Sequence, residues 1–167
     1  FERFPAQEVF GMHNLPEAPL GEISSRQGVI CASETIFEIN ITGKGGHSSM
    51  PHLGVDSILV GSDIVIAIQK ILSRKLKPGT GAVISVTEFI TDGSRNILPG
   101  NTLLKGDFRA FNFKDRISIQ KNLKQICYGI SKLHKVKIEV KFRSDFIETV
   151  NSKNPLSKSF KAAKDLG

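Results

Sequence analysis

The sequence has little cysteine and no long hydrophobic run. Its 167 residues include two cysteines, Cys31 and Cys127, which lie far apart in the chain. Two cysteines are too few for a disulfide scaffold, so we expect reduced thiols and a cytoplasmic protein. No apolar run is long enough to cross a bilayer, and no signal-peptide pattern opens the chain, so we expect no membrane partner.

Acidic residues are scarce relative to basic ones. The chain has 16 Asp and Glu against 23 Lys and Arg, a net charge of +7, while its 40% hydrophobic and 23% charged content is typical of a globular domain. Much of the excess comes from lysines of the second half, such as Lys121, Lys124 and Lys132. A solvated lysine face accounts for it, and a surface for nucleic acid or another anionic partner is the alternative.

Neither end of the chain resembles a natural terminus. The sequence lacks an initiator methionine, opens with FERFP, and stops inside a helix-like pattern at residues 160–166. We therefore expect a piece of a longer protein.

Hydrophobic periodicity predicts strands and helices in a definite order. Strands are expected at residues 35–42, 82–90, 101–111 and 136–142, and helices at residues 55–74 and 114–134. The order β-α-β-β-α-β predicts an α+β, ferredoxin-like domain, in which a four-stranded antiparallel sheet has both helices on one face. The first helix is apolar over more than one side, so this helix and a free sheet edge favour self-association through a two-fold dimer.

The other face of the predicted sheet is open, and one use of an open face is RNA recognition through stacked aromatic side chains. Strands 35–42 and 101–111 superficially resemble the two RNA-contacting strands of such domains. Their alternation instead places Phe37 and Phe108 toward the core, and Glu38 and Asp107 interrupt the two motifs. An RNA-recognition-like module is therefore the weaker alternative.

An enzyme is the other use of the open face. In the loop GKGGHSSMPH (43–52), the glycines allow positive φ or close approach to a ligand, and His47 is placed to donate to an oxyanion or bind a metal. Asn96 precedes the third strand, and Arg109 projects from its open face; together they suit a carboxylate. The simpler alternatives are a surface histidine, a turn asparagine, and an ion pair of Arg109 with Asp107 or Glu88.

Four motifs in one order resemble a known family. They are GMHNLPEAPLG (11–21), GKGGHSSMPHLGVD (43–56), NILPG (96–100) and GDFRAF (106–111). Together they are similar to the M20 metallopeptidases, in the amidohydrolase branch that includes hippurate hydrolases and auxin-conjugate hydrolases. The resemblance implies that residues 1–31 end a catalytic-domain segment, residues 32–147 form a lid and dimerisation domain, and residues 148–167 return to the catalytic domain.

The resemblance also implies roles for single residues. His47 would polarise the scissile carbonyl in the other subunit's active site, Asn96 and Arg109 would hold the substrate carboxylate, and His13 would bind metal. His52 receives no catalytic role. The implied enzyme is a homodimer that hydrolyses the amide bond of a small N-acyl amino acid, with no nucleic acid involved.

The implied cofactors are two divalent metal ions in each active site of the full-length enzyme, with zinc, manganese, nickel and cobalt not distinguished. The sequence contains no candidate for the other metal ligands, and a useful site needs three or four. We therefore expect the isolated fragment to bind no metal and to be inactive, so that it acts alone only as a dimerisation module.

Overall fold

The computed structural model describes residues 3–166 and divides the chain into two compact units. Residues 32–148 form one unit. The terminal segments form the other, of which residues 3–31 and 149–166 are described.

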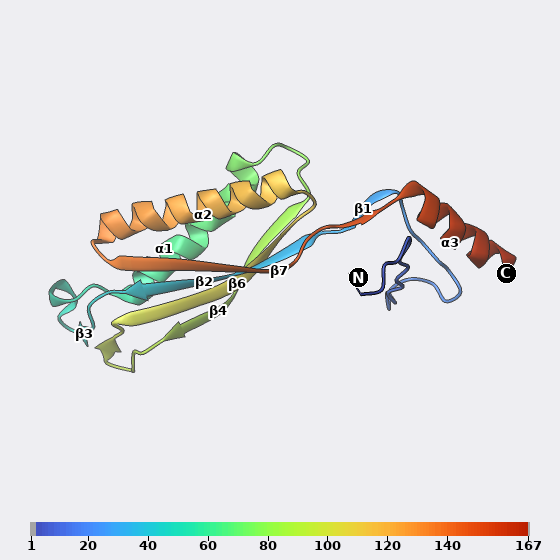
Figure 1. The fold of residues 1–167 in the computed structure, drawn as a ribbon. Helices are drawn as coiled ribbons and strands as arrows, with labels where there is room; N and C mark the ends of the chain where they lie inside the picture. Colours follow the sequence, from blue (N-terminus) through green and yellow to red (C-terminus); the bar gives the residue numbers. More distant parts are fainter. Residues whose placement is uncertain (1–2, 167) are drawn as a thin grey trace. The chain divides into compact units, whose positions relative to one another are not determined.

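The unit of residues 32–148 is built on a four-stranded antiparallel sheet with strand order β4-β6-β2-β7. Its strands are β2 (Ser33–Thr42), β4 (Ala82–Thr91), β6 (Asn101–Ala110) and β7 (Lys137–Phe146). Helix α1 (Ser57–Lys70), which continues into a π-helical turn η2 (Ile71–Lys75), and helix α2 (Phe113–His134) lie on the same face of this sheet (Figure 1). The predicted α+β class, strands and helices are confirmed, with small differences at their ends.

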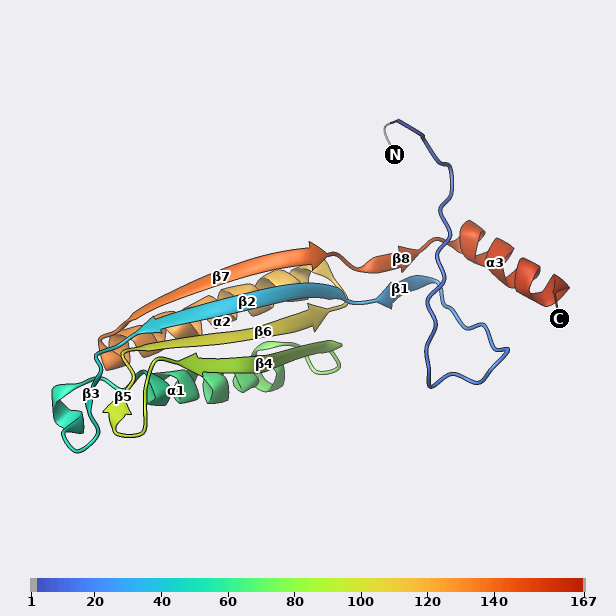
Figure 2. The same ribbon diagram turned by 90° about the horizontal axis from the view of Figure 1, so that it is seen from below.

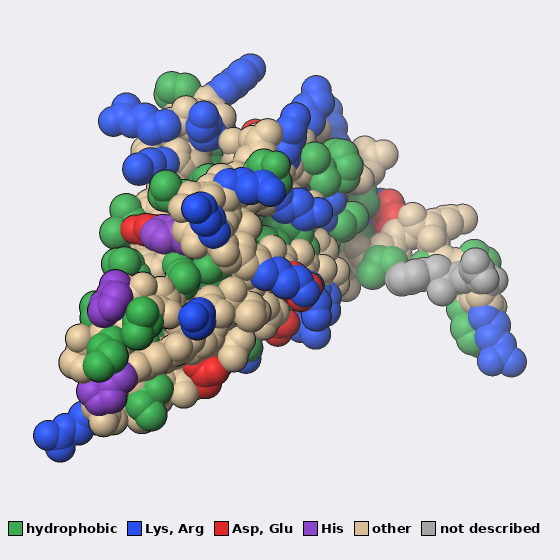
Figure 3. Space-filling view, turned by 90° about the vertical axis from the view of Figure 1, so that its left-hand side faces the viewer, with side chains coloured by type: hydrophobic (Ala, Val, Ile, Leu, Met, Phe, Trp, Pro, Cys, Tyr) green, Lys and Arg blue, Asp and Glu red, His purple; other side chains and the backbone are tan. Residues whose placement is uncertain are grey.

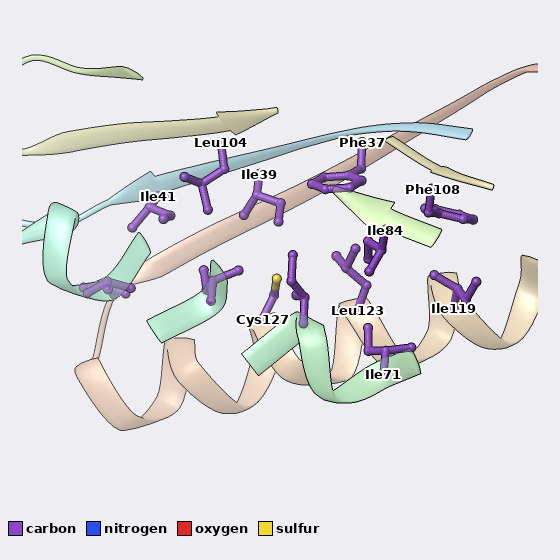
Figure 4. Close-up of a cluster of buried hydrophobic side chains, with 14 of the residues drawn as sticks. Phe37, Ile39, Ile41, Ile71, Ile84, Leu104, Phe108, Ile119, Leu123 and Cys127 are labelled. Atoms are coloured by element: carbon purple, nitrogen blue, oxygen red, sulfur yellow. The ribbon is translucent and has the colours of Figure 1, made fainter. Parts of the chain in front are cut away.

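The core fills the space between the sheet and the two helices, and Figure 4 shows the side chains of the two layers pointing toward one another. The strands contribute Phe37, Ile39, Ile41, Ile84, Leu104 and Phe108; the helices contribute Val60, Ile64, Ile68, Ile119, Leu123 and Cys127. Burial of alternate strand residues is the alternation that the sequence predicted. Because Phe37 and Phe108 are fully buried, they provide no platform for stacked bases.

Side chains at the helix starts account for where the helices begin. The Ile58 amide donates to the Asp56 carboxylate at 2.9 Å, and the Asp115 amide donates to the Asn112 side chain at 2.9 Å, so both first turns are capped. Burial raises the pKa of the Cys127 thiol to about 12, and this cysteine stays protonated as a core residue.

Short elements complete the chain. In the first unit these are β3 (Gly46–His47), the 3-10 turn η1 (Pro51–Leu53) and β5 (Ile97–Leu98). In the terminal unit, β1 (Gly28–Cys31) pairs antiparallel with β8 (Thr149–Asn151), which helix α3 (Lys153–Asp165) follows. Among residues 3–166, no helix combines the length and hydrophobicity that a membrane span requires.

Basic side chains gather over α2, at the top of the view in Figure 3. The α2 lysines Lys114, Lys121, Lys124 and Lys132 are all exposed. Their exposure agrees with a solvated lysine face.

Two glycines of this unit make a matched stability test. A methyl group on Gly106 of β6 would clash with the Ser85 carbonyl oxygen and the Phe37 ring, whereas one on Gly129 of α2 would meet open space. We expect Gly106→Ala to lower the free energy of unfolding by about 1–3 kcal/mol. We expect Gly129→Ala to raise it by about 1 kcal/mol through helix propensity. Urea denaturation checks both, and equal stability of the two variants would contradict the close packing of β4 on β6.

Candidate functional site

His47 and Asn96 lie at a short two-stranded sheet, which is separate from the four-stranded sheet. Strand β3 pairs antiparallel with β5, with His47 opposite Ile97. The Ser48 amide donates to the Asn96 carbonyl at 3.0 Å, which extends the ladder by one residue. The structure therefore brings two of the proposed site residues to neighbouring positions on two paired loops.

The glycines of the histidine loop act through close packing. None of Gly43, Gly45 and Gly46 has positive φ, so that part of the sequence expectation is wrong. A Cβ on Gly45 would lie 2.9 Å from the Leu98 carbonyl oxygen, and one on Gly43 would clash with the Val55 carbonyl oxygen. These glycines let the loop pack against the chain's own backbone, and this packing supports the position of His47.

The imidazole of His47 is oriented by the residue two positions later. The Ser49 amide donates to His47 Nδ1 at 3.1 Å, and Ser49 Oγ lies 2.8 Å from the same nitrogen. A backbone N–H can only donate, so Nδ1 acts as an acceptor and the neutral ring carries its proton on Nε2. His47 is exposed, and its Nε2–H is the group that it can offer to an acceptor such as an oxyanion.

A carboxylate closes the loop that carries Asn96. The Asn101 amide donates to Asp92 Oδ1 at 2.9 Å, and the Asn101 side chain donates to Oδ2 at 2.7 Å. These hydrogen bonds lower the pKa of Asp92, which stays ionised at neutral pH. The two hydrogen bonds between Asp92 and Asn101 join the end of β4 to the start of β6 and limit the conformational freedom of residues 93–100.

Arg109 projects from the open face of β6, as predicted, because its neighbours Phe108 and Ala110 are fully buried. Its Nη2 donates to Glu34 at 2.6 Å and its Nε to Asp107 at 3.1 Å, while its side chain stays 48% exposed. Glu34 lies directly opposite Arg109 on β2. The ion pair with Asp107, which was the simpler alternative for Arg109, is observed, whereas Glu88 pairs with Lys105.

The structure separates Arg109 from Asn96 within one chain. Strands β3 and β5 lie beyond the Asn101 end of β6 (Figure 2). Arg109 lies near the other end of β6, next to Ala110. Arg109 lies eight positions further along β6 than Asn101, a span of about 26 Å. The Asn96 amide and the Arg109 guanidinium therefore do not lie side by side within one chain, because the length of β6 keeps them apart.

His13 lies in the terminal unit, where it is exposed and its Nδ1 is 2.7 Å from the Asn14 carbonyl oxygen. Within residues 3–166, no group of three or more His, Cys, Asp or Glu side chains is arranged to hold a metal ion. His52, in η1, is also exposed. The described residues therefore do not form a metal site by themselves.

A family model described as the peptidase dimerisation domain of M20 peptidases matches residues 35–133, which run from β2 to α2 and leave β7 and the terminal unit outside the match. The chain belongs to the M20 peptidase dimerisation-domain family. This assignment confirms the resemblance drawn from the four motifs.

Curated relatives of this M20 chain are amide hydrolases. An N-acetyldiaminopimelate deacetylase of Exiguobacterium sibiricum is 33% identical over 95% of this chain and 43% of its own length. The hippurate hydrolase of Campylobacter jejuni is 30% identical over 99% of this chain and 43% of its own. The chain thus spans less than half the length of these relatives.

A solved structure supports the fold of this M20 chain. A protein of Bacillus subtilis described as a dinuclear metal-binding peptidase of the M20 family superposes with a TM-score of 0.70 and 27% identity, over 94% of this chain and 38% of that one.

Three contributors to the site escaped sequence analysis, namely Ser49, Asp92 and Glu34. Ser49 has a signal, since a serine two residues after a loop histidine can return a hydrogen bond to its ring. Asp92 also has one, as an aspartate opening a Gly-Ser turn. Glu34 has none, because its pairing with Arg109 depends on strand register.

The orientation of His47 can be measured in the 167-residue chain. We expect two-bond ¹H–¹⁵N correlation spectra of the neutral ring to show His47 as the Nε2–H tautomer. The reason is that the Ser49 amide occupies Nδ1. The exposed His52 serves as the reference. A dominant Nδ1–H form of His47 would contradict the hydrogen bond.

Proposed function

We propose that this chain is the lid and dimerisation part of a metal-dependent amidohydrolase that cleaves the amide bond of N-acyl amino acids. The observation that carries the proposal is the oriented imidazole of His47, with its Nε2–H free and Asn96 beside it. Family membership and the amide-hydrolysing activities named for the relatives support it. Hippurate-like substrates are the narrower form of the proposal.

We further propose that residues 32–147 adopt the ferredoxin-like topology and form the lid. The strand order β4-β6-β2-β7, with α1 and α2 on one face, supports this topology. Residues 1–31 and 148–167 are then the two segments that join the lid to a catalytic domain. Large apolar side chains of the terminal segments, such as Met12 at 88% exposure, are consistent with cover supplied by further protein.

Strand β4 and helix α1 are the proposed dimer surface. β4 is at the edge of the sheet, so its outer backbone groups are unpaired by neighbouring strands within the described chain. Exposed apolar residues on these two elements are Ile58, Leu59 and Ile66 of α1, and Val83, Phe89 and Ile90 of β4. A free edge beside an apolar helix face suits a two-fold partner.

A two-fold contact along β4 would also bring together site residues that lie apart within one chain. Two copies paired antiparallel through β4 place the Asn101 end of one sheet beside the Ala110 end of the other. His47 and Asn96 of one copy then lie toward Arg109 of its partner. In this arrangement the proposed site is assembled from two chains, as the family resemblance implies.

The proposed roles follow from the chemistry of each group. His47 Nε2–H would donate to the oxyanion that develops on the amide carbonyl oxygen, which lowers the energy of the transition state. Arg109 and Asn96 would bind and orient the substrate carboxylate, which positions the amide for attack.

The metal centre of this proposal lies mostly outside the chain. We propose that the full-length enzyme uses two divalent metal ions and that His13 is one ligand, although the described residues supply no set of three. The free cysteines Cys31 and Cys127 are consistent with the proposed cytoplasmic location. A dimerisation module without catalytic contacts is the alternative function, and its test is the effect of the lid residues on turnover.

Lid variants of the full-length enzyme test the catalytic proposal. We expect Arg109→Ala to lower kcat/KM by about 10-fold to 100-fold for N-acyl amino acids, because a charged hydrogen bond is lost. The corresponding carboxamides should lose much less. We expect His47→Ala to lower kcat more than it changes substrate binding. Equal losses on acids and amides would contradict the carboxylate role, and unchanged kcat in His47→Ala would leave only a dimerisation function.

The dimer surface can be tested in the 167-residue chain by sedimentation velocity. We expect concentration-dependent dimers, and we expect Ile66→Lys to weaken dimerisation at least about tenfold because a charge would enter an apolar contact. Leu133→Lys is the matched control, since Leu133 is 74% exposed on α2. Equal effects of the two substitutions would place the contact elsewhere.

A further inference from the structure

Arg109 is already engaged by two carboxylates on the open face. Glu34 faces it across the β2–β6 ladder, and Asp107 precedes it by two residues on the same face of β6. The two ion pairs use Nη2 and Nε of the guanidinium. A guanidinium has five N–H donors, so the two on Nη1 and one on Nη2 stay available for a ligand.

The charge of this cluster is negative. Arg109 contributes one positive charge, and Glu34 and Asp107 contribute one negative charge each. The next cation along the same face of β6 is Lys105, and it pairs with Glu88 at 3.1 Å. A ligand that carries only a carboxylate would gain the free donors of Arg109 and would also meet the repulsion of two nearby carboxylates.

We propose that Glu34 and Asp107 make the Arg109 cluster selective for zwitterionic ligand ends, in which an ammonium group accompanies the carboxylate. The carboxylate binds the free donors of Arg109. The ammonium group donates to the carboxylate oxygens of Glu34 and Asp107 that the two ion pairs leave free. Both charges of the ligand are then matched, and the ligand end brings no net charge to a cluster that is already negative.

This inference rests on the proposed function and narrows its substrate class. The α-nitrogen of an N-acyl amino acid is an amide and carries no charge. The ammonium group must therefore come from the side chain, so the favoured substrates are N-acyl derivatives of amino acids with an amine-bearing side chain.

A purely positioning role for the two carboxylates predicts the opposite result for some substrates. If Glu34 only holds the guanidinium in place, its neutralisation weakens binding of every carboxylate substrate. If Glu34 acts through its charge, the same change weakens binding of ammonium-bearing substrates and strengthens binding of neutral ones. Glu34→Gln separates the two because glutamine keeps the size of the side chain and an oxygen that accepts from Arg109.

The experiment compares two substrates of equal length in the full-length enzyme. They are Nα-acetyl-lysine and Nα-acetyl-6-hydroxynorleucine, in which a neutral hydroxyl replaces the ammonium group. We expect wild-type kcat/KM to favour the lysine derivative by roughly three- to tenfold, as one partly screened charge contact allows. Glu34→Gln should remove this preference by lowering the first value and raising the second, and Asp107→Asn should act in the same direction.

Glu88→Gln is the matched control. It removes a negative charge from the same sheet face, and its partner is Lys105. The control should keep the wild-type preference. Equal losses on both substrates in Glu34→Gln, or a wild-type enzyme that does not distinguish them, would overturn the inference while leaving the amidohydrolase intact. Failure to hydrolyse any N-acyl amino acid would overturn the proposed function, and the inference with it.

Discussion

Burial of one sheet face against α1 and α2 is the constraint on which the other features of residues 32–148 depend. Phe37 and Ile39 of β2 and Leu104 and Phe108 of β6 are fully buried under the helices. Because side chains alternate along a strand, that burial sends Glu34, Asp107 and Arg109 to the opposite face. The charged cluster is therefore a consequence of core packing, and a one-residue slip of β6 would remove it from the open face.

The sequence predicted what depends on local periodicity. The helix at 114–134 is observed as α2 (Phe113–His134), and the strand at 101–111 as β6 (Asn101–Ala110). The expected helix starts at residues 55 and 114 lie within two residues of the observed ones, which Asp56 and Asn112 cap. The face on which Arg109 lies was predictable for the same reason.

The sequence did not predict that the two loops carrying His47 and Asn96 pair with each other. The Gly-His loop and the loop after β4 are joined by the pairing of β3 with β5, two residues each, which is too short to leave a periodic pattern. The distance between Asn96 and Arg109 follows from how far β6 runs before it reaches Arg109, and spacing in sequence alone suggested proximity. The partner of Arg109 on β2 depends on register, which no single sequence reveals.

The pairing of β3 with β5 couples the movements of two loops from different parts of the chain. Gly43 and Gly45 pack on neighbouring backbone, and the Ser48 amide is tied to the Asn96 carbonyl. Any displacement of one loop is passed to the other. Loop-length changes, which surface connections ordinarily tolerate, would here shift an imidazole and an amide at once. These two segments should therefore accept insertions or deletions only in concert.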